Sequence, residues 1–213
     1  MTLRTRPSSR RFRASRHGAS AAVFARKPTG ASSQQGFSQR RLTDRVRSDV
    51  RVLFVGINPG VRSAITNHHF AGYSNRFWKV LFDAGLVPEP LTFLDDDRLP
   101  EWGFGITNLI PRPSPGIDSL TPEEYAAGLV QLRRKVRRWN PAVVALVGVT
   151  LYRFVFNIPS RVPVSLGLQS ERFAGARVFT LPNPSGRNAN VSYAEMVTAF
   201  ASLKRTRARR DSS

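Results

Sequence analysis

The sequence predicts an α/β fold in which a mostly parallel sheet is covered by helices on both faces. Short, nearly continuous apolar runs alternate along the chain with segments of helical periodicity. Such runs are typical of strands buried on both faces, and the alternation implies right-handed crossovers between parallel strands. A chain of 213 residues with 41% hydrophobic content suits one domain with tails.

Four segments carry the strand pattern. The first comprises residues 50–55, Val-Arg-Val-Leu-Phe-Val, and ends at Gly56. The other runs are residues 104–110, 142–147 and 178–181. We therefore expect the fold to begin at Val50 and to contain four strands.

Two helices are expected at opposite ends of the domain. Ser74 is in a position to cap the first, which carries Phe77, Trp78, Leu81 and Phe82 and ends at Gly85. The last helix opens with a capping box formed by Ser192 and Glu195.

The clearest helix signal lies in the middle of the chain. Thr121 and Glu124 form a capping box, and Pro122 occupies the first helical position. The apolar positions share one helix face and are Tyr125, Leu129, Leu132, Val136 and Trp139. The Arg and Lys residues between 133 and 138 fall largely off this face, which favours a solvated surface over a DNA contact.

The formal net charge of +19 is concentrated in the tails. Residues 1–49 hold twelve Arg and Lys against two Asp, and residues 204–213 hold five against one Asp. Because Lys and Arg gain affinity by displacing counterions from phosphates, a polyanion is the expected partner. We expect a disordered basic tail at 1–48, a domain at 49–204 and a basic tail at 205–213. The alternatives are a merely solvated tail and, for the acid-free first 43 residues, an organellar transit peptide.

Composition excludes several chemistries. The chain has no Cys, which rules out disulfides, cysteine nucleophiles and thiolate-bound metals. With three His residues it is a poor candidate for a metal site. No apolar run approaches the roughly 18 residues of a membrane span. The expectation is a soluble monomer, cytoplasmic in a bacterium and nuclear or organellar in a eukaryote.

Two motifs follow strand ends. Residues 56–60 read Gly-Ile-Asn-Pro-Gly after the first run, and residues 182–187 read Pro-Asn-Pro-Ser-Gly-Arg after the last. Taken alone, each motif is an ordinary turn signal. Ligands of open α/β sheets bind beyond the carboxyl ends of the strands, so we expect both motifs to face one crevice.

Together with three further stretches, these motifs resemble the mismatch-specific uracil-DNA glycosylase and thymine-DNA glycosylase branch of the uracil-DNA glycosylase superfamily. The stretches are Phe70-Ala71 followed by Asn-Arg-Phe-Trp-Lys-Val-Leu at 75–81, Gly-Ile-Thr-Asn-Leu at 105–109, and Arg112-Pro113. The resemblance covers residues 52–203. It implies a three-layer α/β/α sandwich on a four-stranded parallel sheet, with no metal or cofactor. It also implies a monofunctional glycosylase of base excision repair that flips uracil out of double-stranded DNA containing G·U or related lesions.

The resemblance assigns roles at the base. Asn58 would be catalytic, because its amide oxygen can accept a hydrogen bond from the attacking water, although an amide cannot take up a proton. Phe70 would stack on the extruded base, and Ile57 would read the pyrimidine edge through backbone groups. Asn108 would line the pocket. Taken alone, Asn58 fits a turn residue better than a catalytic one, and Phe70 fits a core position better than a stacking one. Asn108 fits a turn or cap residue equally well.

The second motif, residues 182–187, would bind the DNA backbone and the space left by the flipped base. Asn183 stands where the wider superfamily has a His that stabilises the departing base, which points to the mismatch-specific branch. Ser185 and the backbone amide of Gly186 would hold a phosphate. Arg187, or Asn188 beside it, would fill the gap left by the flipped base, and an ordinary phosphate contact is the alternative for Arg187.

Other interpretations remain open. His68 and His69 are expected as an exposed loop pair, and the alternative is a contact to DNA or to the attacking water. A non-catalytic basic DNA-binding protein on the same fold is the second functional hypothesis. Asn58 beside Phe70 argues against it, because a mere binder needs no water-orienting amide beside a stacking ring. A nucleotide-binding protein is disfavoured, because neither usual Gly-rich phosphate loop is present.

Overall fold

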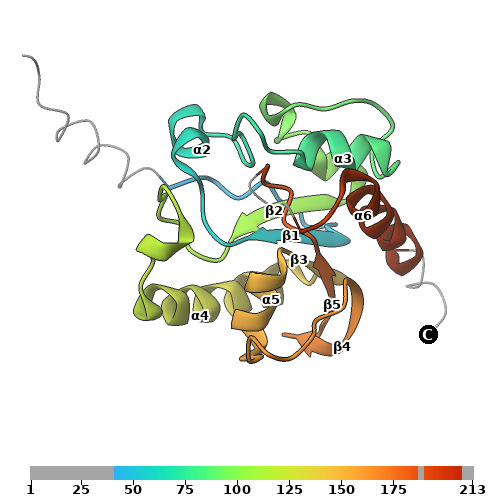
Figure 1. Cartoon of the computed structure of the whole chain (residues 1–213). Coiled ribbons are helices and arrows are strands. Elements are labelled where there is room, and N and C mark those ends of the chain that lie inside the picture. Colours follow the sequence, from blue (N-terminus) through green and yellow to red (C-terminus); the bar gives the residue numbers. More distant parts are fainter. Residues whose placement is uncertain (1–40, 187–189, 208–213) are drawn as a thin grey trace, which may run out of the picture. The chain divides into compact units, whose positions relative to one another are not determined.

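A five-stranded sheet of order β2-β1-β3-β5-β4 forms the middle layer of the fold (Figure 1). The computed structural model describes residues 41–186 and 190–207. The four expected strands are present and parallel: β1 (Val52–Gly56), β2 (Phe104–Asn108), β3 (Val143–Val147) and β5 (Ala176–Leu181). Their burial on both faces explains why apolar runs predicted them.

The expected count of four strands is wrong, because β4 (Gly167–Phe173) adds an antiparallel edge strand beside β5. Side chains of β4 alternate between half-buried and exposed up to Arg172, so the sequence shows no continuous apolar run. The hairpin turns at Ala174 and Gly175, which have φ values of 51° and 96°. Hydrophobic continuity detects central strands and misses an edge strand of this kind.

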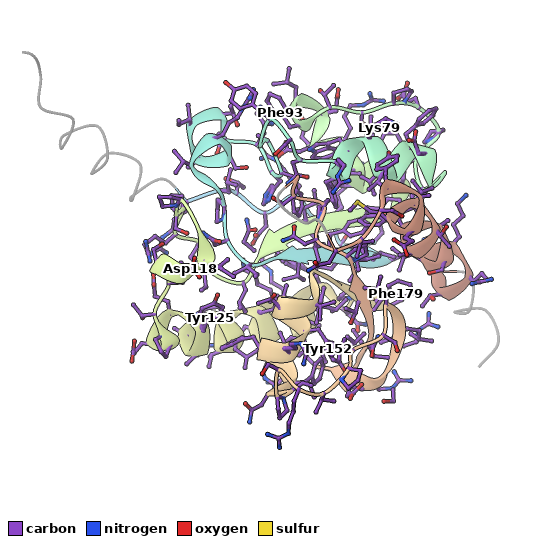
Figure 2. The ribbon with its side chains drawn as sticks, viewed as in Figure 1. Lys79, Phe93, Asp118, Tyr125, Tyr152 and Phe179 are labelled. Atoms are coloured by element: carbon purple, nitrogen blue, oxygen red, sulfur yellow. The ribbon has the colours of Figure 1, made fainter. Side chains whose placement is uncertain are left out.

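Helices cover both faces of the sheet. On one face, α3 (Phe77–Asp83) and α6 (Tyr193–Arg207) pack with Val52 and Phe54 of β1. On the other, α4 (Pro122–Trp139) and α5 (Val149–Phe156) pack with Leu53 and Val55. Figure 1 shows these layers, with the short α2 (Val61–Thr66) on the side of α3. In Figure 2, Lys79 lies in the α3 layer and Tyr152 in the α5 layer.

The two expected capping boxes are confirmed. At α4, the Thr121 side chain accepts from the Glu124 N–H, and the Glu124 carboxylate accepts from the Thr121 N–H. Ser192 and Glu195 exchange the same pair of bonds at α6. The first helix differs from expectation, because Asn75 rather than Ser74 accepts from the N–H of Phe77.

Shorter elements fill the connections. Three 3₁₀ helices, η1 (Phe93–Asp95), η2 (Leu99–Trp102) and η3 (Ile117–Ser119), were not expected from the sequence.

None of the helices in the described ranges combines the length and apolarity needed to cross a membrane.

Residues on the N-terminal side of residue 49, where the domain was expected to begin, also pair with the sheet. Residues 43–46, here called the edge segment, lie along the open edge of β2. Arg45 and Ile106 exchange backbone hydrogen bonds of 3.0 and 2.9 Å. Asp44 accepts from the Thr107 hydroxyl and forms an ion pair with Lys135 of α4. The edge segment therefore covers an edge that would otherwise present unpaired backbone groups.

Candidate functional site

The carboxyl ends of the parallel strands lie side by side. Gly56 at the end of β1 is in register with Asn108 at the end of β2. Val147 at the end of β3 is likewise in register with Leu181 at the end of β5. The motifs that follow these strands therefore emerge at one edge of the sheet, as expected for an open α/β fold.

Asn58 is held by its amide nitrogen. Nδ2 donates to Ser114 Oγ at 2.7 Å and to Pro59 O at 3.1 Å, with Arg112 O at 3.5 Å. Ser114 Oγ in turn donates to Gly116 O at 2.6 Å, so the hydroxyl is fixed as an acceptor for the amide. With the nitrogen committed to these partners, Oδ1 is the atom that Asn58 presents to a further partner. The side chain is half-buried, which leaves it reachable from solvent.

Ser114 is a site residue that the sequence analysis missed. It is only 2% exposed, and its N–H donates to Pro59 O at 3.0 Å, forming a bridge between its loop and the first motif. The sequence offered one indication of this role, because Ser114 directly follows Arg112-Pro113, one of the stretches that carry the resemblance. The contact could not be predicted from the sequence, because 56 residues separate Asn58 from Ser114.

Arg112 fastens this loop to α4. Its guanidinium donates to both carboxylate oxygens of Glu124, with Nη2 at 2.8 Å from Oε2, and also to Ser119 O. These hydrogen bonds lower the pKa of Glu124 to about 2, with the N–H of Thr121 contributing to the shift. Through this ion pair, Arg112 holds the loop that contains Ser114 against α4.

Phe70 combines a stacked ring with a strained backbone conformation. Its ring stacks on the fully buried Phe77 with centroids 4.0 Å apart and planes 19° from parallel. The residue is half-buried and has a φ of 52°, which costs a non-Gly residue about 1–2 kcal/mol. The ring is thus packed on one side, and this arrangement is compatible with a base stacking on the other.

Neighbouring hydrogen bonds hold Phe70 in this conformation. Asp96 accepts from His69 N at 2.9 Å, His69 O accepts from Trp78 Nε1 at 3.1 Å, and Ser63 Oγ accepts from Ala71 N at 3.1 Å. Strained residues persist where the surroundings over-determine them, and such positions concentrate at functional sites.

Asn108 and His69 are in contact. Asn108 Nδ2 lies 3.4 Å from His69 Nδ1, and His69 Nε2 lies 3.0 Å from Thr43 O in the edge segment. His69 is 1% exposed, and burial lowers its pKa despite the nearby Asp96 and Asp44. The imidazole is therefore neutral at neutral pH.

The expectation of an exposed His pair is wrong. His69 is buried, and His68 is half-buried with its Nδ1 2.9 Å from Asp96 Oδ1. Asp96 is fully buried and also accepts from Arg45 Nε at 3.0 Å. The carboxylate partner was not recognised from the sequence because it lies 28 residues away in an irregular segment.

Ile57 belongs to the connection between the first two strands. Its carbonyl accepts from Ile110 N at 2.8 Å, just as Gly56 O accepts from Leu109 N at 2.9 Å. Its side chain packs partly buried on the α4 and α5 side. These bonds fix the first motif against the end of β2.

The second motif reaches the same edge. Asn183 is exposed, and its Oδ1 accepts from Ser185 N at 3.0 Å, closing a turn. Pro184 O accepts from Arg76 N at 2.9 Å, which joins this loop to the start of α3. Gly186 is required at its position, because a Cβ there would lie 2.5 Å from Ser74 Cβ. Arg187 and Asn188 lie outside the described residues.

The structure thus brings Asn58, Phe70, Asn108 and Asn183 to one edge of the sheet, and adds Ser114 and His69 as their partners. Within residues 41–186 and 190–207, no group of His, Asp and Glu side chains is arranged to hold a metal ion.

One comparison with known proteins bears on the site. The family model described as "Uracil DNA glycosylase superfamily" matches residues 43–204. The match spans more than half of the chain and includes every site residue described above. It also begins at Thr43, where the edge segment first contacts the domain.

Proposed function

We propose, from the premise that this chain belongs to the uracil DNA glycosylase superfamily, that it hydrolyses uracil from mismatched double-stranded DNA without a metal or cofactor. Membership already implies a DNA glycosylase that acts on DNA. The proposal adds the substrate, a G·U or related mismatch, and the role of each residue. The observation that carries it is the amide of Asn58, tied through its nitrogen so that its oxygen is presented.

The reaction requires a positioned water more than a strong base. Breaking the bond between uracil N1 and the sugar C1′ sends the bonding pair to the base, and positive charge develops on the sugar. Uracil leaves as an anion. Water then bonds to C1′ and gives an abasic sugar, and the proton that the water loses is taken up by the uracil anion. Asn58 Oδ1 can accept a hydrogen bond from this water and orient it, although it cannot remove its proton. Departure of the base therefore runs ahead of attack.

Base recognition would involve three other residues. Phe70 offers a ring already stacked on Phe77, so that a flipped base continues the stack. Asn108 offers amide groups at the end of the neighbouring strand β2, and Ile57 offers backbone groups of the first motif, although its carbonyl already accepts from Ile110 N. Extrusion costs least at a mismatch, so a G·U pair is an easier substrate than a Watson–Crick pair.

Asn183 favours the mismatch-specific branch. An amide N–H is a weaker hydrogen-bond donor to the departing base anion than the N–H of an imidazole or imidazolium would be. In addition, Asn183 Oδ1 is engaged with Ser185 N. Weaker stabilisation of the leaving group makes the enzyme slow and favours bases that are easily extruded. Ser185 and Gly186 would contact a phosphate beside the flipped nucleotide.

The test is a set of labelled duplexes that carry one uracil, thymine, hypoxanthine or ethenocytosine opposite guanine. Abasic sites are scored by alkaline cleavage in the presence of EDTA. We expect cleavage at uracil by the wild type and a large loss with Asn58→Ala at unchanged DNA affinity. Tight binding without any abasic product would instead support the second hypothesis, a non-catalytic DNA-binding protein.

A further inference from the structure

The C-terminal ends of α4 and α6 lie at the edge of the sheet opposite the candidate site. Because α4 joins the carboxyl end of β2 to the amino end of the parallel strand β3, it runs against the strands. Where it ends, Val143 N donates to Arg51 O at 3.0 Å. Next to it, Arg177 N donates to Ala142 O at 3.1 Å, and the Arg177 guanidinium donates to Thr206 O in the last turn of α6. Both helix ends therefore meet the amino ends of β1, β3 and β5, here called the amino edge.

Exposed Arg and Lys side chains gather at the amino edge. They come from the last two turns of α4, the end of α6, the start of β1 and the position in β4 that lies opposite Arg177. The set, here called the basic face, comprises Arg51, Arg133, Arg134, Arg137, Arg138, Arg172, Lys204 and Arg205. Within residues 41–186 and 190–207, none of this set forms an ion pair with a carboxylate, whereas Lys135 of α4 pairs with Asp44. The basic face is therefore a positive surface that the described part of the chain does not neutralise.

The dipole of α4 accounts for only part of this charge. Cations in the last turn of a helix are favourable, and Arg137 and Arg138 are placed there. Arg133 and Arg134 stand one turn earlier, and Arg51 belongs to no helix. Like charges four residues apart destabilise a helix, and the last two turns of α4 carry two such pairs. Binding of a polyanion would relieve this repulsion.

The make-up of the basic face suits the phosphates of a duplex. From the sequence, the Arg residues of α4 favoured a solvated surface, because the pattern of one helix does not show what packs beside it. The fold adds cations from three other parts of the chain. Residues 47–51, 133–138, 172–177 and 204–206 contain no exposed aromatic side chain. Since single strands are held largely by stacking of bases on aromatic rings, this surface fits the backbone of a duplex better.

We propose that the basic face binds the phosphate backbone of a second segment of double-stranded DNA while the candidate site holds the first. The family acts on DNA, so DNA is the polyanion that this chain meets in its work. The inference goes beyond the proposed function, because it concerns undamaged DNA and a surface that takes no part in the reaction. A protein that holds two segments can pass from one to the other without release into solution.

One straight duplex does not reach both places. The strands β1, β2 and β3, which separate the two edges of the sheet, are five residues long, or about 16 Å. A duplex that crosses the carboxyl edge would have to bend around the domain to meet the basic face. DNA resists bending on this scale, because its persistence length is about 150 base pairs. A separate segment meets no such cost.

The test is capture of a second duplex by the full chain. A duplex with an abasic analogue opposite guanine is immobilised and loaded with protein, and the excess protein is washed away. A short labelled duplex without a lesion is then added, and the captured label is measured between about 50 and 200 mM salt. We expect the wild type to capture the second duplex and to lose it as the salt concentration rises, as phosphate contacts require.

A triple variant, Arg51→Gln with Arg134→Gln and Arg138→Gln, tests the basic face. The log–log slope of capture against salt should fall by about 2.7, which is about 0.9 for each of three lost phosphate contacts, and capture should weaken on the order of 10-fold or more. Affinity for the immobilised duplex should be unchanged, because the three side chains stand at the other edge of the sheet. They are exposed and unpaired, so the fold should be retained, which thermal melting checks.

The matched control removes the same number of charges from the N-terminal tail, as Arg10→Gln with Arg11→Gln and Arg13→Gln. These residues lie outside the described ranges. Capture by this variant should keep the slope of the wild type. Equal losses in the two triple variants, or a loss confined to the tail variant, would overturn the proposal. It would also be overturned if the wild type captured no second duplex or captured an RNA duplex in preference to DNA.

This proposal and the proposed function fail in different ways. Capture of a second duplex by a wild type that releases no uracil would refute the proposed function alone. Uracil release without capture would refute the second DNA site alone.

Discussion

Replacing Ser114 by Ala removes the hydroxyl that accepts from Asn58 Nδ2 at 2.7 Å. Nδ2 keeps Pro59 O at 3.1 Å and Arg112 O at 3.5 Å, so the amide remains partly oriented. Loss of one neutral hydrogen bond costs about 0.5–1.5 kcal/mol. If this cost appears in the transition state, the rate of uracil release falls by roughly 2- to 12-fold. Asn58→Ala removes the oxygen that holds the water and should cost on the order of 10²- to 10⁴-fold.

The assay is single-turnover release of uracil from a G·U duplex with enzyme in excess, for both single variants and the double variant. Because Ser114 acts through Asn58, Ser114→Ala should cause no further loss in the Asn58→Ala background. Ser119→Ala is the matched control, since Ser119 Oγ also donates to Gly116 O, at 2.9 Å, but does not contact Asn58. It should leave the rate close to that of the wild type.

Losses that multiply in the double variant would show that Ser114 acts independently of Asn58. A loss as large for Ser119→Ala as for Ser114→Ala would mean that the loop around Gly116, rather than the Asn58 amide, had been disturbed. Either result would refute the reasoning. Thermal melting of each variant checks that the fold is retained.

Three further outcomes are expected. Phe70→Ala should weaken binding of a uracil-containing duplex by roughly 5- to 150-fold, from the about 1–3 kcal/mol of base–aromatic stacking; an unchanged affinity would place Phe70 in the core only. Deletion of residues 1–42, which spares the edge segment, should flatten the salt dependence of DNA binding by about 0.9 in log–log slope per lost phosphate contact; an unchanged slope would make the tail a solvated or targeting segment. Because Arg112 lowers the pKa of Glu124 to about 2, their pair stabilises the fold fully above the ordinary pKa of 4.5 and loses that contribution as pH falls through about 2. Arg112→Ala should accordingly lower Tm at pH 7, with a difference from wild type that shrinks toward pH 2; a difference independent of pH would contradict this origin.

The sequence was sufficient for the central part of the fold. Strands buried on both faces must be apolar throughout, so β1, β2, β3 and β5 were visible as runs of apolar residues. Capping boxes are local, since their partners stand three residues apart, and those at Thr121 and Ser192 were both confirmed. Edge strand β4 alternates between half-buried and exposed side chains and pairs only with β5, so no continuous apolar run revealed it.

The candidate site divides in the same way. Asn58 and Asn183 were expected at one place because parallel strands put their carboxyl ends at one edge of a sheet, whatever the details of the loops. Phe70 and Asn108 were identified only through the resemblance to a known family. Their chemical roles remain predictions.

The partners of these side chains were decided only by tertiary structure. Ser114 meets Asn58 across 56 residues of chain, and Thr43 meets His69 across 26. Which atom of an amide or an imidazole faces the site depends on such long-range partners, and an isolated sequence does not specify them. The sequence by itself therefore determined which residue types stand at the edge of the sheet, whereas the packing of distant segments determined which of their atoms are presented there.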